Sequence, residues 1–549
     1  MTKPGANARP GGRILVDCLK LHGTTMAFCV PGESFLAALD AFHDTPEIKL
    51  ITCRQEGGAA MMADAYGRLT GRPGICFVTR APGATNASAG LHIAFQDSTP
   101  MILFIGQVGR AMLEREAFQE IDYRRMFTPL AKWVAEIEDA RRIPEFVSRA
   151  FHTATSGRPG PVVLALPEDM LTDRVEATMT GPYREVQAAP SPEDMAELHA
   201  MLGRAKRPIA ILGGRGWDEK AWNDFQAFAE ATAMPVAVSY RTQDRFDNTH
   251  PNYAGDLGIG PNPKLGAAMR DADLVLVVGA RLGEITTSGY TLFDVPRMKA
   301  KLVHVYPGPE ELGRVYYPDL PINAGMKTFA AAARAMPPVK TPWAEATKAL
   351  RRAYEDWIKP VRIPGPVQMG EIMVWLREHL PPDAIMCNGA GNYTVWLHRF
   401  YQHRRFRTLL APTSGSMGFG TPAAVGAKLL FPDRTVVAFA GDGCFLMNGQ
   451  ELATAVRYGA NIIILVINNG MYGTIRMHQE RDYPGRVTAS DLTNPDFAAL
   501  ARAYGAHGET VERTEDFAPA FKRGSSALMT RAGAHPLAIF ASAPQAHRD

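Results

Sequence analysis

The chain repeatedly places a short, continuous apolar run before a segment whose apolar residues have helical spacing. TMAFCVPG stops at Pro-Gly, and MILFIGQV and GPVVLALP carry almost no polar residue. Strands that are apolar on both faces belong to parallel sheets covered by helices on each side. The pattern predicts an α/β fold built from doubly wound parallel sheets.

Three such blocks follow one another. The first covers residues 10–180, the second 190–345 and the third 365–549. The polar, Pro-rich stretch GPYREVQAAPSPED near 181–195 predicts the first linker, and residues 335–365 predict the second. Because 549 residues exceed the size of one hydrophobic core, we expect three domains.

Composition excludes several classes of protein. The net charge is +3, and no dense Lys/Arg run predicts a nucleic-acid partner. The six cysteines include no CxxC pair, which favours reduced thiols over a disulfide framework or a zinc site. The start, MTKPGANARPGG, has no apolar signal core, and no 18-residue apolar span follows. We therefore expect a cytoplasmic protein with no membrane partner.

Two polar side chains follow two buried strands of the third block. Asp442 lies between Gly441 and Gly443 after RTVVAFA, and Asn469 follows IIILVI. The intervening CFLMNGQELATAVRYG has helical spacing. A right-handed crossover brings the two strand ends side by side, where ligands of parallel sheets gather. The two side-chain oxygens suit Mg²⁺ beside a phosphate, which the glycines allow close to the backbone.

GDG followed 27 positions later by NN resembles the motif of enzymes that use thiamin diphosphate (ThDP). The resemblance implies a diphosphate held through Mg²⁺, with Asp442, Asn469 and the Met471 carbonyl as metal ligands. It implies further cofactor contacts from Gly441, Gly443, Cys444 and Tyr472. The family usually has Ser or Ala in place of Cys444, a change that we expect the cofactor to tolerate. Outside this family, Asp-Gly is a common strand-end turn.

CRQEGGAAMMADAYGRLTG resembles the family segment that carries one buried glutamate, R-x-E-x-x-A-x-x-x-A-x-G. The resemblance implies that Glu56 shares a proton with the cofactor's pyrimidine, from a different domain than the diphosphate site. A carboxyl in apolar surroundings keeps its proton more readily, which suits this exchange. The alternative is a carboxylate that only stabilises a helix N-terminus.

Two further segments resemble the family's cofactor site. SGSMGFGTPAAVGA is similar to the segment that folds ThDP into a V. It implies that Met417 lies between the two rings and that the Gly415 carbonyl accepts a hydrogen bond from the cofactor. NGAGNY implies diphosphate contacts from Gly391 and Asn392.

Three motifs resemble the acetolactate synthase branch: VTRAPGATNAS, FQDSTPMILFIGQV and EAFQEIDYRRMFTPLAKW. There, Phe118 and Gln119 would lie near the active centre. The acceptor site differs, because Ile285 replaces the family arginine that pairs with the second substrate's carboxylate, and His478 replaces a tryptophan. The segment that helps to hold FAD is altered as well, which argues against FAD.

Other residues suggest a rebuilt substrate site. Arg80 and Arg476 are candidate readers of an anionic substrate, and Thr474 and Ile475 would line the pocket. Each arginine has an alternative role in an ion pair. Glu33 stands where some related 2-oxo-acid decarboxylases carry a proton-shuttling residue, and it is a candidate acid/base. Its alternative role is a charge at a helix N-terminus.

The leading functional prediction is a ThDP- and Mg²⁺-dependent enzyme that decarboxylates a 2-oxo acid and ligates the product to an acceptor. The alternative is a non-ligating 2-oxo-acid decarboxylase similar to benzoylformate decarboxylase, whose loop the string NNGMYGTIR matches. His92 alone in GLHIAFQDS disfavours a yeast-type pyruvate decarboxylase. A non-catalytic cofactor-binding homologue is a third possibility. The family implies a homodimer or homotetramer with active sites between subunits.

Overall fold

The computed structural model describes residues 7–529 and 537–542. The first residue of the predicted strand PLAIFAS lies outside these residues, and so does the N-terminal MTKPGA. Contacts divide the chain into two compact units. Unit 1 comprises the described residues of Met1–Val186, Thr421–Pro432 and Asn448–Ala460, and unit 2 those of Gln187–Gly420, Asp433–Met447 and Asn461–Asp549. Each unit is described by itself.

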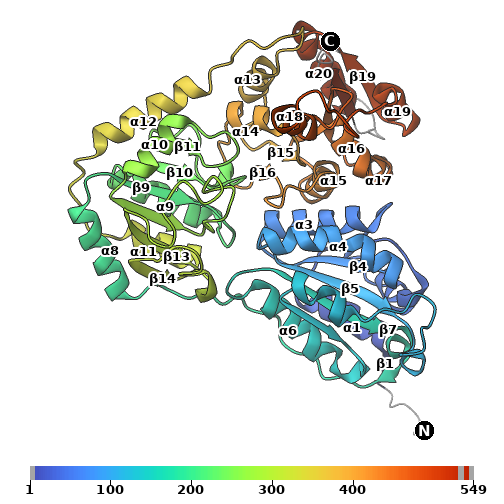
Figure 1. The fold of residues 1–549 in the computed structure, drawn as a ribbon. Helices are drawn as coiled ribbons and strands as arrows, with labels where there is room; N and C mark the ends of the chain where they lie inside the picture. The colour runs from blue at the N-terminus through green and yellow to red at the C-terminus, as the bar shows by residue number, and fades with distance from the viewer. Residues whose placement is uncertain (1–6, 530–536, 543–549) are drawn as a thin grey trace. The chain divides into compact units, whose positions relative to one another are not determined.

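Unit 1 contains a six-stranded parallel sheet of order β3-β2-β4-β5-β7-β6 (Figure 1). Its strands are β2 (Met26–Cys29), β3 (Lys49–Thr52), β4 (Gly74–Val78), β5 (Met101–Gln107), β6 (Trp133–Glu136) and β7 (Pro161–Pro167). Its helices are α1 (Gly11–Leu21), α2 (Leu36–His43), α3 (Glu56–Thr70), α4 (Ala81–Gln96), α5 (Tyr123–Phe127), α6 (Ile143–Thr155) and α7 (Glu168–Thr172). β1 (Arg9–Pro10) and β8 (Arg174–Val175) form an antiparallel pair.

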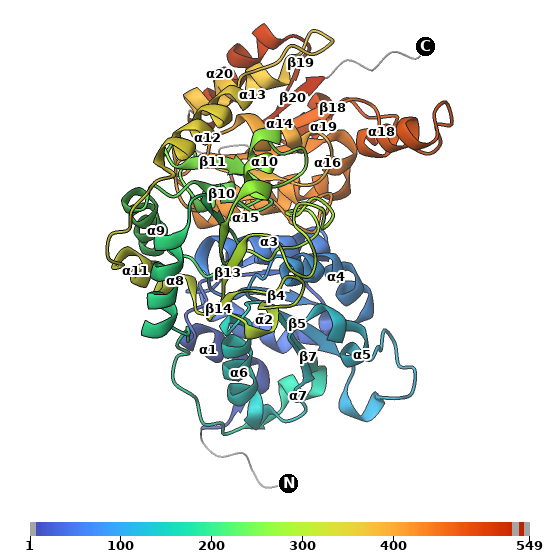
Figure 2. The ribbon, with the colours of Figure 1, turned by 60° about the vertical axis from the view of Figure 1, so that its left-hand side comes forward.

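Helices cover both faces of this sheet, so its apolar strands are buried as the sequence predicts. One face packs its aliphatic and aromatic side chains against α1, α2 and α6. The other face carries α3 and α4, which lie side by side in Figures 1 and 2. The Arg68 guanidinium on α3 bonds Asp64 at 2.5 Å and Asp97, at the end of α4, at 2.6 Å. Paired charges in the interior hold the two helices in one register.

Unit 2 contains two more parallel sheets. The first has the order β11-β10-β9-β12-β13-β14. Its strands are β9 (Pro208–Leu212), β10 (Val236–Val238), β11 (Tyr253–Asp256), β12 (Leu274–Val278), β13 (Lys301–Tyr306) and β14 (Leu320–Asn323). Its helices are α8 (Pro192–Arg204), α9 (Glu219–Ala231), α10 (Pro263–Asp271), α11 (Met326–Arg334) and α12 (Ala344–Trp357). Figure 2 shows β13 and β14 beside α8 and α11.

The last sheet has the order β16-β15-β17-β18-β20-β19 and all its strands are parallel. Its strands are β15 (Ile385–Asn388), β16 (Leu409–Leu410), β17 (Val436–Gly441), β18 (Ile463–Asn468), β19 (His507–Val511) and β20 (Leu537–Ser542). The helices of this part of the chain are α13 (Met369–His379), α14 (Thr394–Phe400), α15 (Gly420–Leu430), α16 (Asp442–Asn448), α17 (Leu452–Tyr458), α18 (Gly473–Asp482), α19 (Phe497–Ala503) and α20 (Thr514–Met529). Most of α15 and all of α17 belong to unit 1.

Two local expectations differ from the structure. The second predicted linker contains α12, because its Pro-rich flanks obscure an amphipathic helix that buries Tyr354. The predicted crossover helix after Asp442 is interrupted: α16 ends at Asn448, a 3₁₀ turn covers Gly449–Glu451, and α17 follows. Glycine at this break disfavours a continuous α-helix. The predicted adjacency of the two strands is confirmed, since Gly441 pairs with Ile467.

Candidate functional site

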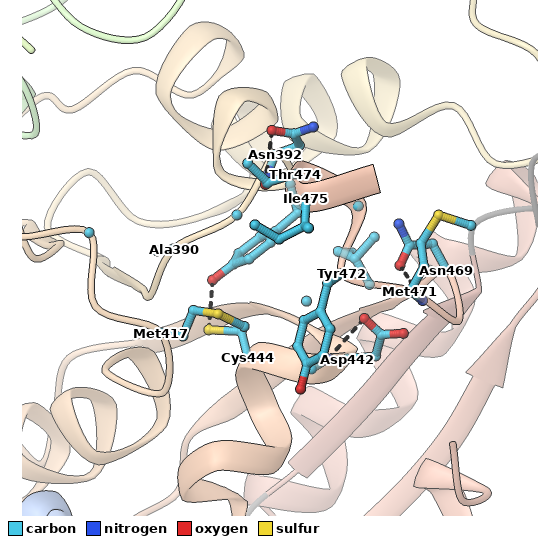
Figure 3. Close-up of a pocket in the computed structure, with 17 residues that line it drawn as sticks. Ala390, Asn392, Met417, Asp442, Cys444, Asn469, Met471, Tyr472, Thr474 and Ile475 are labelled. Atoms are coloured by element: carbon cyan, nitrogen blue, oxygen red, sulfur yellow. Dashed lines mark hydrogen bonds between the residues drawn. The ribbon is translucent and has the colours of Figure 1, made fainter. Parts of the chain in front are cut away.

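A pocket of about 240 Å³ lies at the carboxyl ends of β17 and β18 in unit 2 (Figure 3). Residues from four segments line it: Ala390, Gly391, Asn392, Tyr393, Gly415, Met417, Gly441, Asp442, Gly443, Cys444, Ile467, Asn469, Met471, Tyr472, Gly473, Thr474 and Ile475. All eleven cofactor-contact candidates of the sequence analysis are therefore among its lining residues. Parallel strands produce this convergence, because their carboxyl ends meet at one edge of the sheet.

Asp442 is the most constrained side chain of the pocket. It is 2% exposed. The Gly443 backbone N–H donates to Oδ1 at 2.9 Å, and the Gly470 N–H donates to Oδ2 at 2.8 Å. Asn494 Nδ2 donates to the same Oδ2 at 2.7 Å. These three donors hold the Asp442 side chain at the strand end in one orientation.

The loop after β18 presents the other two candidate metal ligands. Asn469 Oδ1 accepts a hydrogen bond from the Met471 N–H at 3.3 Å. Residues 470–472 are pinned by an antiparallel bridge between Met471 and Asp491 and by the bond from the Tyr472 N–H to the Ser490 carbonyl at 2.8 Å. The loop is thus shaped by a later segment of the chain, and Gly470 supplies the positive φ of 67° that its turn requires.

Cys444 and Tyr393 form a buried, hydrogen-bonded pair in the wall of the pocket. The Tyr393 hydroxyl donates to Cys444 Sγ at 3.1 Å and accepts a hydrogen bond from the Gly389 N–H at 3.1 Å. The Gly418 N–H also donates to Cys444 Sγ, at 3.2 Å. Burial raises the pKa of the Tyr393 phenol well above its usual value. The sulfur of Cys444 therefore acts here as a hydrogen-bond acceptor that joins two pocket walls.

Replacing Tyr393 by Phe is expected to destabilise the protein by about 1–3 kcal/mol, because the buried Gly389 N–H loses its acceptor. Urea-induced unfolding of the two proteins measures this difference. Tyr483→Phe is the matched control, since Tyr483 is exposed. Equal unfolding midpoints for the Tyr393→Phe and Tyr483→Phe proteins would contradict the prediction.

Arg241 supports the segment that carries Gly415 and Met417. Arg241 is buried, and its NH1 donates to the Pro412 carbonyl at 2.5 Å. The Gly415 N–H donates to the same carbonyl at 3.1 Å, which closes a turn in which Gly415 has φ 67°. Arg241 follows β10 and has an unusual backbone φ of 58°. Its side chain thus holds the loop whose Met417 lines the pocket.

The residues present fit a diphosphate and a magnesium ion. A Cβ at Gly443 would lie 2.5 Å from the Tyr472 ring, so a larger residue there would force a shift, and one at Gly441 would lie 3.0 Å from the Tyr393 ring, which is a tight contact. One carboxylate, one amide oxygen and a carbonyl suit Mg²⁺, which takes its remaining ligands from phosphate and water. Among the described residues, no group of three or more His, Cys, Asp or Glu side chains forms a self-sufficient metal site.

The start of α18 closes one side of the pocket. Thr474 Oγ1 accepts from the Asn392 N–H at 2.9 Å and donates to Asn392 Oδ1 at 3.0 Å. Ile475 lines the pocket and is partly exposed. Arg476 is not among the lining residues; it pairs with Glu480 at 2.9 Å and with Asp491 at 3.7 Å. Of the two predicted roles of Arg476, anion binding and an ion pair, the structure shows the ion pair.

In unit 1, Glu56 is the first residue of α3, directly after β3 and a short turn. Its Oε2 accepts a hydrogen bond from Asn86 Nδ2 on α4 at 2.9 Å. A Cβ at Gly83 would lie 3.3 Å from Glu56 Oε1, so the small first turn of α4 leaves room for the carboxylate. The pairing of α3 with α4 therefore orients Glu56.

The other candidates of unit 1 gather around Arg80, which follows β4. Arg80 NH2 lies 3.4 Å from Glu33 Oε1 and 3.1 Å from Glu168 Oε2. Its NH1 donates to the Phe118 carbonyl at 3.5 Å, and the Gln119 carbonyl accepts from the Ala81 N–H at 3.2 Å. The Phe118 side chain is exposed. Four segments, which follow the parallel strands β2, β4, β5 and β7, thus meet at one sheet edge.

Three residues that contact the candidate site residues were not predicted from the sequence: Asn86, Glu168 and Asn494. Asn494 precedes a proline, which indicates a turn but not a partner for Asp442. Glu168 follows β7 and Arg80 follows β4, so both residues lie at the carboxyl edge of the same parallel sheet. That shared edge was the signal that could have predicted their ion pair. The two residues that differ from the acetolactate synthase pattern lie at accessible positions. Ile285 is partly exposed in a loop after β12, and His478 is exposed on α18.

Three parallel sheets with these polar sheet edges define the class of protein. Residues 9–126 match the N-terminal TPP binding domain of thiamine pyrophosphate enzymes, residues 195–333 the central domain, and residues 389–532 the C-terminal TPP binding domain. The chain belongs to the thiamine pyrophosphate (ThDP) enzyme family, which confirms the predicted resemblance and fold class.

Its relatives place it in the acetolactate synthase-like branch. The acetolactate synthase large subunit of Corynebacterium glutamicum is 31% identical, over 94% of this chain and 86% of the relative. That of Parasynechococcus marenigrum is 33% identical over 92% and 84%. The isozyme 2 large subunit of Escherichia coli is 30% identical over 92% and 91%. The chain is thus similar to ThDP-dependent enzymes that form or cleave C–C bonds.

Over residues 7–529 and 537–542, none of the helices has both the length and the apolar character that a bilayer crossing requires.

Proposed function

We propose that the protein is a Mg²⁺- and ThDP-dependent enzyme that decarboxylates a 2-oxo acid and ligates the product to an acceptor. The observation that carries the proposal is the pocket at the ends of β17 and β18, where Asp442 and Asn469 lie beside Gly441 and Gly443, at which a Cβ would crowd the neighbouring tyrosine rings. Asp442, Asn469 and the Met471 carbonyl would hold the metal, and Gly441 and Gly443 would admit the diphosphate.

Bound ThDP would supply the nucleophilic carbon and the electron sink that decarboxylation of a 2-oxo acid requires. Residues of this chain would orient the cofactor and exchange a proton with it. Glu56 would hold a proton against the pyrimidine ring, and Asn86 keeps its carboxylate in place at 2.9 Å. Met417 would separate the two rings, in a loop that Arg241 holds through the Pro412 carbonyl.

The charges around Arg80 support an altered acceptor site. Arg80 already lies between Glu33 and Glu168, so it has no uncompensated charge to offer a second carboxylate. Ile285 stands where the branch has its carboxylate-binding arginine, and an aliphatic side chain makes no ion pair. These features favour an acceptor other than a second 2-oxo acid.

A non-ligating decarboxylase is the second candidate, and Glu33 favours it. The Glu33 side chain is 61% exposed and ends at the sheet edge that also carries Arg80. An accessible carboxyl there can return a proton to the product, which releases a free aldehyde without an acceptor.

Glu33→Gln is expected to lower the rate of aldehyde release about tenfold. The loss is partial, because a side chain this accessible can be replaced in part by water as the proton donor. Product analysis by NMR under steady-state turnover measures it, with Glu47→Gln as an exposed control in the same unit. Unchanged turnover of Glu33→Gln would remove Glu33 from the mechanism.

The assembly and location also belong to this proposal. We propose a homodimer or homotetramer with active sites between subunits, in the cytoplasm, with domains at 10–180, 190–345 and 365–549 and without FAD. Two apolar side chains on α16 and two on α18 are each about half exposed, and exposed apolar side chains support covered surfaces in an assembly: Leu446, Met447, Ile475 and Met477. Sedimentation velocity tests the assembly.

The test of the function is CO₂ release from a panel of 2-oxo acids, pyruvate and aromatic ones included, with ThDP and Mg²⁺. NMR of the products separates the candidates. A C–C-coupled product supports the carboligase, and free aldehyde alone supports the decarboxylase. No CO₂ from any acid, with ThDP shown to bind, would overturn both, because the donor would then not be a plain 2-oxo acid.

A further inference from the structure

Glu451 is a buried carboxylate to which the proposed chemistry gives no part. It ends the 3₁₀ turn that interrupts the helix after Asp442, and it is 0% exposed. Burial raises the pKa of its carboxyl, and the hydrogen bonds that it accepts oppose this shift. A carboxyl group is costly to bury without partners, so its contacts indicate what it does.

Two of those partners are the backbone groups directly before Glu56. The Arg54 N–H lies 3.1 Å from Glu451 Oε1 and 3.3 Å from Oε2, and the Gln55 N–H donates to Oε1 at 3.0 Å. Thr454 Oγ1 donates to Oε2 at 2.6 Å and orients the carboxylate from its other side. Glu451 and residues 54–55 both belong to unit 1, although almost 400 residues separate them in the chain.

The first turn of α3 is shaped around this carboxylate. A Cβ at Gly58 would lie 2.6 Å from Glu451 Oε1, so glycine leaves the space that the carboxylate occupies. Gln55 caps the helix by accepting from the Gly58 N–H at 3.0 Å. Gln55 is extended, with φ −150° and ψ 141°, and the helix begins at the next residue, Glu56.

We propose that Glu451 is a positioning residue for Glu56: its carboxylate holds the Arg54 and Gln55 amides so that α3 starts at Glu56 and presents its side chain to Asn86. The proposal rests on the proposed function only in giving Glu56 its catalytic part. Since helix ends fray by one or two residues, a helix whose first residue does chemistry gains precision from an external anchor.

The size of the effect follows from geometry. Misplacing a reacting group by about 1 Å can lower a rate about 100-fold. Glu451→Gln keeps one acceptor oxygen and the side-chain shape, so we expect about a tenfold fall in kcat.

The first test is hydrogen–deuterium exchange of the full-length protein without cofactor or substrate. In Glu451→Gln the Arg54 and Gln55 amides are expected to exchange at least about tenfold faster, because they lose a charged acceptor. The Gly71 amide, at the far end of α3, bonds Gly67 at 2.9 Å and should not change. Glu145→Gln, at an exposed pair in unit 1, is the matched control. Unchanged exchange at Arg54 and Gln55 would overturn the proposal.

The second test is a double-mutant cycle on the rate of CO₂ release. If Glu451 acts through Glu56, Glu451→Gln lowers kcat about tenfold alone and changes the residual rate of Glu56→Gln less than twofold. Independent, multiplicative losses would contradict the proposal. Gly58→Ala provides a second variant, because its methyl group displaces the carboxylate while alanine favours the helix. It should reproduce both effects.

The two tests separate this inference from the proposed function. Faster exchange at Arg54 and Gln55 in an enzyme that decarboxylates nothing would leave the anchor intact and overturn the function. Decarboxylation that depends on Glu56 but not on Glu451 would leave the function intact and overturn the anchor.

Discussion

Glu56→Gln is expected to lower the rate of CO₂ release by about 10²–10⁴-fold, the range that a positioned acid or base contributes. Glutamine has nearly the same shape and can still accept the bond from Asn86 Nδ2, which is 2.9 Å from Glu56 Oε2. It has no carboxyl proton to share. The change therefore removes the proposed proton exchange while it keeps the start of α3.

Single-turnover CO₂ release at saturating ThDP and Mg²⁺ measures this effect. Glu47→Gln is the control, because Glu47 is an exposed glutamate in the same unit, where it forms an ion pair with Lys20. ThDP affinity, followed by tryptophan fluorescence, should change much less than the rate. A Glu56→Gln protein with undiminished turnover would show that another group exchanges the proton, and the proposed mechanism would be wrong.

Asp442→Asn is expected to weaken Mg²⁺-dependent ThDP binding by about 100-fold or more. Replacing groups that only support a metal ligand typically costs about 10–100-fold, and loss of the one charged ligand should cost at least as much. Asparagine would also turn its amide N–H₂ toward one of two backbone donors, the Gly443 N–H or the Gly470 N–H, which now donate to the two carboxylate oxygens at 2.9 and 2.8 Å. Two donors facing each other repel.

Isothermal titration of the protein with ThDP at several Mg²⁺ concentrations measures the affinity. Asp491→Asn makes the same chemical change in the neighbouring segment, at an exposed side chain. It should leave binding close to that of the unaltered protein. If Asp442→Asn kept its metal-dependent affinity, the metal would not lie at the end of β17.

Short-range pattern predicted which residues gather at the ends of β17 and β18, and for a physical reason. Asp442 and Asn469 follow adjacent parallel strands, so their positions in the chain imply a shared sheet edge. The same logic did not identify Asn494, whose bond to Asp442 Oδ2 depends on a loop folding back over the pocket. Loop paths are not encoded in strand periodicity.

Charged partners were harder to predict than strand ends. Arg80 and Arg476 both looked available to an anion in the sequence, but Arg80 lies between two glutamates, and Arg476 pairs with Glu480 and Asp491. Only Glu480 stands at the helical spacing from its arginine that a sequence can show. The proposed acceptor chemistry depends on these pairings.

Glu451 shows most clearly where sequence and tertiary structure divide. The sequence by itself determined three apolar, helix-covered parallel sheets and the residues that follow their strands, because continuous apolar runs and helical spacing are local properties of the chain. Only the tertiary structure decided that a carboxylate after α16 meets the amides before Glu56. Such contacts join segments almost 400 residues apart, and their partners are chosen by packing and by the need to satisfy buried charge, which no local pattern records.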